Sequence, residues 1–280
     1  MSLPRRRSAV IGICTDSHSL LSPQIIERYA IEVVPLTINI DDVEYLDGVD
    51  LDADAYYAVN AAAAQSSASP TKPSSGQFAL AYDRLVERGV DQIISVHTSF
   101  GVEGTLTSAR LATRCSGVPV RVIDTASPSF AMSCAVWETA RAVANGERLC
   151  EAITIAEQTS AGVGNLFVYE ASEACRSASG HASAGLSLMS LIDDQVQVVH
   201  QVDTCSDAAR AMAAGLATTA QPVNVVLAHA NRCGEAMIAE LHGLIGGMQN
   251  VNEIMRCRIG PSIAAYTSHC GAGMFFYPIT

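Results

Sequence analysis

The chain has 280 residues, enough for two modest domains that each bury a core. Hydrophobic residues make up 49% of it and charged residues 16%, a composition that excludes disorder and predicts a large apolar interior. The net charge of -11 argues against binding to nucleic acid or to anionic membrane surfaces, because both require a basic face.

Alternating apolar and amphipathic stretches in the first half predict β-α units around a parallel sheet. Strands are expected at Ala9–Cys14, Glu32–Ile40, Gln92–Val96 and Val118–Ile123. Helices are expected between and after them, at Pro23–Tyr29, Ala53–Ala64, Gly76–Glu87, Gly104–Thr113 and Pro128–Ala144. The unbroken apolar character of the strands indicates that both faces of the sheet are covered.

The composition changes after Gly146, where we place a domain boundary. A helix at Glu147–Thr159 and a strand at Asn165–Tyr169 follow, and then Leu188–Val202 reads as an antiparallel hairpin that turns at Asp193 and Asp194. The remaining pattern predicts helices at Ser206–Thr218 and Arg232–Leu244 and strands at Val223–Ala228 and near Val251 and Met274. The predicted fold class is therefore α/β, with an amino-terminal domain (8–146) built on a parallel sheet flanked by helices and a smaller α+β domain (147–280).

Several kinds of chemistry lack their sequence signals. The nine cysteines are scattered with no C-x-x-C spacing, which indicates neither a zinc site nor a disulfide scaffold. Phosphate-binding loops, a G-x-S-x-G elbow and an H-E-x-x-H motif are all missing, and the seven histidines never pair at metal-ligand spacing. The sequence thus predicts no cofactor and no metal. The apolar stretch Ala9–Cys14 is too short for a signal peptide and no segment is long enough to span a membrane, so the expected location is the cytoplasm.

Three polar loops follow strands or precede helices at what should be one edge of the parallel sheet. They are Thr15–Ser17, Thr71–Gly76 and Thr98–Thr105. Ligands of open α/β sheets bind beyond the carboxyl ends of the strands, so these loops are candidates for a ligand site. For each loop alone, simple capping of a helix amino terminus by Ser or Thr is an equal alternative.

The order of these and later fragments resembles the DegV family along nearly the whole chain. The matching fragments include Thr15-Asp16-Ser17, Tyr45-Leu46-Asp47-Gly48, Pro73-Ser74-Ser75-Gly76, Gly104-Thr105, Ile123-Asp124-Thr125 with Ser127, Ala228-His229-Ala230-Asn231 and Ser268-His269-Cys270-Gly271. The resemblance implies a carrier that performs no chemistry itself, holds a fatty acid or other lipid between its two domains, and delivers it to a separate fatty-acid kinase.

The resemblance also implies the ligand-binding residues. The carboxylate would be held by the two hydroxyl-rich loops of the first domain, with help from a basic residue of the second domain and from a histidine near the carboxyl terminus. In this chain these positions indicate the following residues: Thr71, Ser74, Thr98, Ser99, Glu103, Gly104, Thr105, Ser127 and His269.

The chain departs from the family pattern at three positions: Pro70 replaces a threonine, Glu103 a serine, and Asp203 the basic residue. Two like charges about 4 Å apart repel by about 4 kcal/mol at an effective dielectric of ~20, so an ionised ligand would not lie beside an ionised Glu103. Three solutions remain open. Glu103 turns away and leaves Thr98 or Ser99 as donors, which we favour, with Lys72 as a possible source of positive charge; or Glu103 is protonated; or the ligand is no anion.

Two other hypotheses stand beside the carrier. One is an enzyme for a small polar metabolite, with Glu103, Asp203 and His269 as acid-base groups. The other is a paralogue whose ligand specificity has changed or been lost.

Overall fold

The structure is a computed structural model, and it describes residues 9–62, 68–99, 104–127, 129–168, 186–192, 195–230, 232–264 and 271–279. Two compact units divide the chain, and neither is continuous in sequence. Unit 1 comprises residues 1–19, 23–35 and 72–160, and unit 2 comprises residues 20–22, 36–71 and 161–280. A segment of the amino-terminal half, residues 36–71, therefore belongs to the same unit as the carboxyl-terminal half.

Unit 1 is built on a four-stranded sheet in the order β2-β1-β6-β7, in which every pair is parallel. The strands are β1 (Ile11–Asp16), β2 (Glu32–Val34), β6 (Gln92–His97) and β7 (Val120–Asp124). The helices are α1 (Pro23–Arg28), α3 (Ser75–Glu87), α4 (Thr105–Ala112), α5 (Ser129–Ala144) and α6 (Leu149–Ala161), and a 3-10 turn, η1 (Ser17–Ser19), follows β1. The predicted parallel sheet flanked by helices is confirmed.

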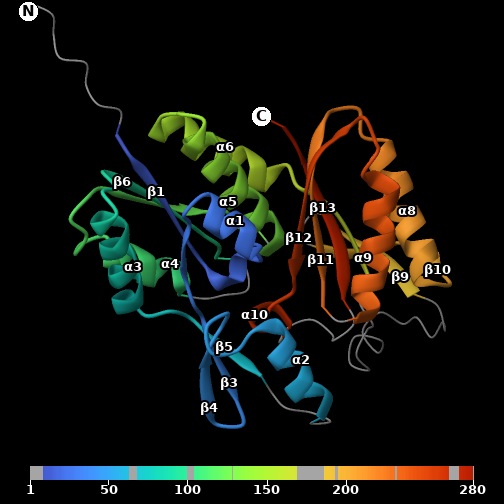
Figure 1. The fold of residues 1–280 in the computed structure, drawn as a ribbon, viewed down its shortest axis with the longest axis horizontal. Helices are drawn as coiled ribbons and strands as arrows, with labels where there is room; N and C mark the ends of the chain where they lie inside the picture. Colours follow the sequence, from blue (N-terminus) through green and yellow to red (C-terminus); the bar gives the residue numbers. More distant parts are fainter. Residues whose placement is uncertain are drawn as a thin grey trace, which may run out of the picture. The chain divides into compact units, whose positions relative to one another are not determined.

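Helices α3 and α4 pack side by side on one face of this sheet, and α5 packs against β1 and β6 (Figure 1). The core between the sheet and helices α3 and α4 contains Cys14, Phe78, Tyr82, Leu85 and Ile93, all fully buried or nearly so. An ion cluster borders it, in which the buried Glu32 of β2 pairs with the exposed Arg84 and Arg88 of α3. These contacts fix α3 against the sheet and so position the loop in front of it.

Unit 2 contains a six-stranded sheet in the order β10-β9-β8-β13-β11-β12. Its strands are β8 (Gly164–Val168), β9 (Leu186–Ile192), β10 (Gln195–Val202), β11 (Val223–His229), β12 (Val251–Arg258) and β13 (Ala272–Pro278), and its helices are α8 (Cys205–Ala217), α9 (Arg232–Ile245) and α10 (Pro261–Ala264). The hairpin predicted at Leu188–Val202 is confirmed by the antiparallel pairing of β9 with β10, although its turn at Asp193 and Asp194 lies outside the described residues.

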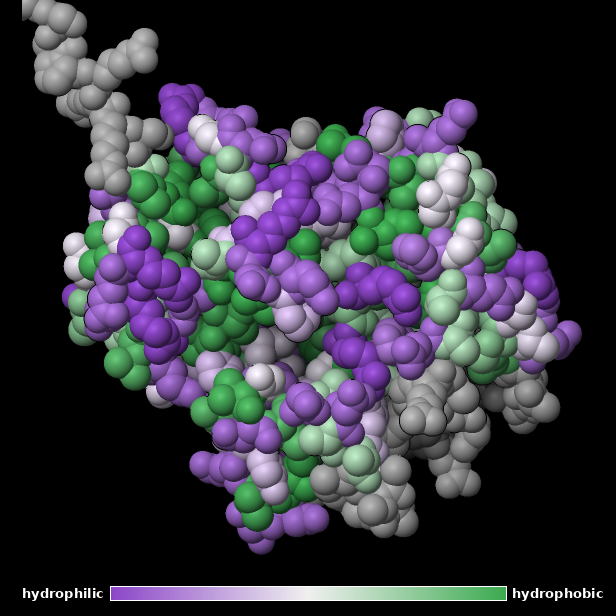
Figure 2. Space-filling view, in the orientation of Figure 1, coloured by the Kyte–Doolittle hydropathy of each residue, from purple (hydrophilic) through white to green (hydrophobic). Residues whose placement is uncertain are grey.

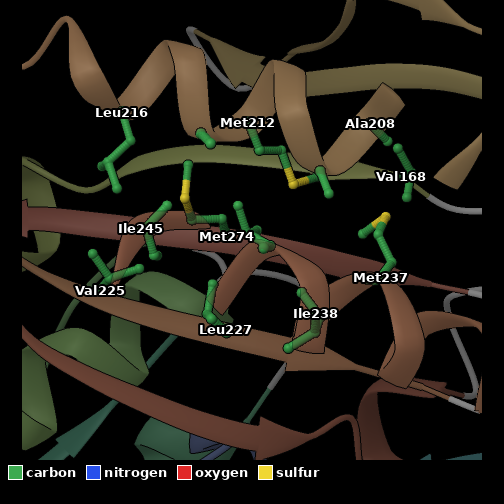
Figure 3. Close-up of a cluster of buried hydrophobic side chains, with 14 of the residues drawn as sticks. Val168, Ala208, Met212, Leu216, Val225, Leu227, Met237, Ile238, Ile245 and Met274 are labelled. Carbon is green, nitrogen blue, oxygen red and sulfur yellow. The ribbon is translucent and has the colours of Figure 1, made fainter. Parts of the chain in front are cut away.

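The core of this sheet is aliphatic and rich in methionine. Helices α8 and α9 lie side by side over the strands (Figure 1), and their side chains point at those of β8, β11 and β13. Figure 3 shows Met212, Met237 and Met274 in one cluster with Leu216, Val225, Leu227 and Ile238. The small residues of α8, such as Ala208 and Ala209, are fully buried here, so the alanine-rich helix packs tightly into the core.

The strand predicted as one element at Glu32–Ile40 is two strands in two sheets, so that prediction was wrong. Strand β2 ends at Val34, and β3 (Thr37–Ile40) pairs antiparallel with β4 (Val43–Leu46) and β5 (Ser69–Thr71) in a three-stranded sheet of unit 2. Pro35 between them has no amide hydrogen and interrupts strand pairing.

The arm that carries β3, β4, β5 and helix α2 (Ala53–Ala62) is anchored within unit 2 by polar contacts. The hydroxyl of Tyr57 donates to the carbonyl of Ile259 at 3.1 Å, and the Arg258 guanidinium pairs with Asp54 at 2.7 Å. The same guanidinium lies 5.7 Å from the centre of the Tyr57 ring. These contacts join residues about 200 positions apart in the sequence.

The surface mixes apolar and polar side chains. Leu80 of α3 and Leu111 of α4 are among the exposed large apolar residues, and Figure 2 shows hydrophobic residues interspersed with hydrophilic ones on the face in view. In the part of the chain that the structure describes, no helix is long and apolar enough to cross a membrane.

Candidate functional site

The carboxyl ends of β1 and β6 are joined by buried hydrogen bonds. The Thr15 hydroxyl donates to the carbonyl of Val96 at 2.9 Å. Asp16 Oδ2 lies 2.6 Å from His97 Nδ1, and His97 Nε2 lies 2.7 Å from the hydroxyl of Ser95. These bonds hold the two central strands in one fixed register at the edge where ligands of such sheets bind.

The order carboxylate, imidazole, hydroxyl is the one used to activate a serine nucleophile. In this chain, however, both Ser95 and His97 are completely buried, and the Tyr82 hydroxyl from α3 lies 3.0 Å from Ser95 Oγ. A nucleophile must reach its substrate, so this chain of side chains acts as a structural connection among β1, β6 and α3.

The loops after β6 and β7 are tied together. The hydroxyl of Thr98 donates to the carbonyl of Ser127 at 2.6 Å, and the backbone amides of Ser99 and Ala126 both donate to Asp124 Oδ1, at 3.0 and 2.9 Å. The described parts of these two neighbouring loops thereby form one platform. Because this platform is built before any ligand arrives, the polar atoms it leaves unused are preorganised for binding.

Two hydroxyls at this edge are buried and have no hydrogen-bond partner in the described structure: those of Thr105 and Ser127. Thr105 is the first residue of α4 and is only 1% exposed. The residue before it, Gly104, has φ of 90° and no side chain, so it gives α4 no side-chain cap. Buried hydroxyls without partners are costly, and they indicate a place where an acceptor from a ligand fits.

His18 is a third such group, and the sequence analysis did not identify it. Its amide donates to Asp16 Oδ1 at 3.0 Å in the turn after β1, while its Nδ1 is buried with no partner among the described residues. Burial lowers the pKa of His18 below its ordinary value of 6.5, and the nearby Asp16 opposes the shift only in part. His18 is therefore neutral at pH 7. The signal available in the sequence was its position directly after the polar loop Thr15–Ser17.

The predicted ligand-binding residues are placed as follows. Thr98, Ser99, Gly104, Thr105 and Ser127 all lie in unit 1, at the carboxyl ends of the adjacent strands β6 and β7. Glu103 and His269 lie outside the described residues.

Two further candidates, Thr71 and Ser74, have hydrogen bonds of their own. Ser74 caps α3 in a reciprocal arrangement in which its hydroxyl accepts the amide of Gln77 while the Gln77 side chain accepts the amide of Ser74. Thr71 belongs to β5 in unit 2, where its hydroxyl accepts from the Asn39 side chain at 3.0 Å. The helix-capping alternative weighed for this loop therefore describes what the Ser74 hydroxyl does.

Of the substituted positions, Pro70 lies within β5, opposite Ile38 of β3. Asp203 is exposed, directly before the residue that caps α8, Thr204. Among the residues that the structure describes, no group of three or more His, Cys, Asp or Glu side chains is arranged to hold a metal ion.

The geometry so far defines an α/β protein of two units, in which the parallel sheet of unit 1 ends in a preorganised, hydroxyl-bearing platform. The model of the family described as "Uncharacterised protein, DegV family" matches residues 10–174. The chain belongs to the DegV family, as the sequence resemblance indicated.

Known relatives cover nearly the whole chain. A DegV domain-containing protein of Streptomyces coelicolor is 27% identical over 270 residues, which span 92% of this chain and 94% of that protein. Among solved structures, a DegV family protein from Thermus thermophilus, described as binding fatty acid, superimposes with a TM-score of 0.82 at 20% identity and covers 96% of this chain and 100% of its own. DegV of Bacillus subtilis, described as a fatty acid binding protein, gives 0.79 at 19% identity, covering 97% and 100%. These structures establish that the fold is shared.

Proposed function

We propose that this protein is a non-catalytic carrier of fatty acids or related lipids that presents its acyl ligand to a partner fatty-acid kinase. The observation that carries the proposal is a pair of buried hydroxyls that have no partner among the described residues, those of Thr105 and Ser127, at the carboxyl ends of β6 and β7. A carboxylate supplies acceptor oxygens for donors of this kind.

The family supports the choice of ligand. The T. thermophilus and B. subtilis proteins that share this fold are described as binding fatty acids. A head group at the platform would accept hydrogen bonds from Thr105, from Ser127 and from the amides at the start of α4, which Gly104 does not cap and where the helix dipole favours negative charge. Thr98 and Ser99 would serve mainly to hold the two loops in place, because their hydroxyl or amide already bonds within the platform.

The carrier role, as opposed to catalysis, is supported by the burial of the hydrogen-bonded Asp16, His97 and Ser95 side chains. An acyl ligand would then be modified by another protein: a kinase would transfer the terminal phosphoryl group of ATP to the ligand carboxylate, giving an acyl phosphate and ADP. Cytoplasmic location and an acyl chain held between the two domains stay predictions of the same proposal.

The direct test is ligand binding by the delipidated protein. The protein is purified, its bound molecules are identified by native mass spectrometry and denaturing extraction, and fatty acids of graded chain length are then titrated into the stripped protein. We expect a co-purifying fatty acid and saturable binding at one site per chain. A folded, stripped protein that binds no fatty acid would refute the proposal.

The kinase step has its own test. A fatty-acid kinase of the same organism is supplied with ATP and fatty acid, with and without this protein. We expect acyl phosphate to form only when the protein is present. Equal amounts of acyl phosphate in both reactions would refute the carrier role but not the proposal of lipid binding.

A further inference from the structure

Lys72 is the only lysine in the chain; the other sixteen of its seventeen basic Lys and Arg residues are arginine. It stands just before Pro73 and Ser74, the residue that caps α3. A chain that uses arginine at every other basic position has one compact ammonium group, and its location is therefore informative.

The Lys72 side chain lies over Gly104, at the amino terminus of α4. A Cβ atom added to Gly104 would come within 2.4 Å of Lys72 Nζ and 2.6 Å of Lys72 Cδ. Only a residue without a side chain leaves this space open, and the φ of 90° at Gly104 favours glycine as well. The stem of Lys72 thus packs on the backbone of Gly104 and carries its ammonium group to the first turn of the helix.

This placement is electrostatically unfavourable in the absence of a ligand. The start of a helix carries a partial positive charge, and a second positive charge beside it is repelled. Within the part of the chain that the structure describes, no acidic side chain forms an ion pair with Lys72, although the protein has 28 acidic residues and a net charge of -11. The buried Thr105 hydroxyl, unpartnered in the same turn, adds a donor that also lacks an acceptor. One anion would satisfy all three features.

We propose that Lys72 is the cation that recognises the ligand head group, so that the site selects acyl lipids with an ionised head group over neutral ones of the same chain length. This inference rests on the proposed function and adds the class of ligand and the residue that determines it. Lys72 would supply, from the loop in front of α3, the positive charge that Asp203 cannot supply.

The test compares a fatty acid with the fatty alcohol of the same chain length, on wild type and three variants. Lys72→Met keeps the length of the stem and removes the charge, and Lys72→Arg keeps the charge. Arg114→Met is the matched control, because it removes an equal charge just beyond the other end of α4, where the residue is exposed.

We expect Lys72→Met to weaken fatty-acid binding about tenfold, because water screens the attraction between the exposed ammonium and the carboxylate only in part. Alcohol binding should not change, because the alcohol head group carries no charge. Lys72→Arg should retain most of the preference for the acid, and Arg114→Met should retain all of it. Lys72→Met should also raise the thermal midpoint of the ligand-free protein, since it removes the repulsion at α4. A residue with a merely structural role would lower that midpoint.

The single lysine permits a direct observation. Reductive methylation with 13C-formaldehyde labels only Lys72 and the terminal amine while keeping their charge, and the Lys72 methyl resonance should shift on addition of fatty acid but not of fatty alcohol. If Lys72→Met binds the acid as tightly as wild type and the resonance does not move, this inference is wrong and the carrier function stands. If wild type binds neither lipid, the carrier function falls, and this inference with it.

Discussion

The buried hydroxyl of Thr105 gives a prediction in which stability and binding change in opposite directions. Thr105→Val replaces the hydroxyl by a methyl group of nearly the same size. Because this hydroxyl is 1% exposed and has no partner in the described structure, the ligand-free protein carries its desolvation cost, which is about 1–3 kcal/mol for such a group. We expect Thr105→Val to raise the free energy of unfolding of the stripped protein by about 1–2 kcal/mol.

Thr15→Val is the matched control. Thr15 lies in the same unit and is also fully buried, but its hydroxyl donates to the carbonyl of Val96 at 2.9 Å. The same substitution there removes a hydrogen bond that is made, and it should lower the free energy of unfolding by about 0.5–1.5 kcal/mol. The free energy of unfolding should therefore be higher than that of wild type in Thr105→Val and lower in Thr15→Val.

Urea unfolding followed by tryptophan fluorescence measures this difference. The only tryptophan, Trp137, is fully buried in α5 of unit 1, so its emission reports the unit that contains both substitutions. Fatty-acid affinity should fall about 10- to 150-fold in Thr105→Val, because a hydrogen bond to a charged acceptor contributes about 1.5–3 kcal/mol. A Thr105→Val protein that is as destabilised as Thr15→Val would show that a protein group already satisfies the Thr105 hydroxyl, and the reasoning would fail.

Three other predictions concern buried titratable groups. His97→Leu should lower the free energy of unfolding by about 3–5 kcal/mol, since it leaves the buried Asp16 carboxylate without its partner at 2.6 Å; an unchanged urea midpoint would contradict this. The pKa of His18 is lowered by burial, so the folded state binds fewer protons than the unfolded state, and stability should decrease as the pH falls through 6.5 and below, with this residue contributing at most about 1.4 kcal/mol per pH unit. His18→Gln should make that pH profile shallower, and superimposable profiles would count against the burial of a neutral imidazole. Burial raises the pKa of Cys14 to about 12, so iodoacetamide at about pH 8 should modify the exposed Cys115 and spare Cys14, as peptide mass mapping would show; equal labelling would mean that Cys14 is accessible.

The parallel sheet of unit 1 could be predicted because its strands are short, apolar and covered on both faces, and because amphipathic helices separate them. The arm at residues 36–71 could not be predicted. Its strands pair antiparallel with each other, and its contacts to Arg258 and Ile259 link residues about 200 positions apart, which no local pattern records. Proline at position 35 was the one local sign that the chain leaves the first sheet there.

The site could be predicted at the level of loops but not of individual atoms. The sequence indicated three polar loops, and Thr15 and Thr98 do lie at the carboxyl ends of β1 and β6, whereas Thr71 of the remaining loop belongs to β5 of unit 2. It could not show that Ser74 caps α3 while the hydroxyls of Thr105 and Ser127 lack partners, because all three are short hydroxyl residues at loop ends. The packing of Lys72 on Gly104, 32 positions apart, depends on how α3 and α4 lie side by side and is visible only in three dimensions.

Two features assigned to the site reduce the stability of the ligand-free protein. A buried hydroxyl without an acceptor and an ammonium group beside a helix amino terminus each cost free energy that folding elsewhere must offset. A ligand that relieves both costs binds the folded chain and not the unfolded one. It therefore stabilises the folded chain by RT ln(1 + [L]/Kd), which is about 2.7 kcal/mol when the ligand concentration is a hundred times Kd. Variants that lose the ligand should consequently lose this gain while gaining intrinsic stability. Opposite changes in ligand binding and in ligand-free stability distinguish residues of a binding site from residues that only support the fold.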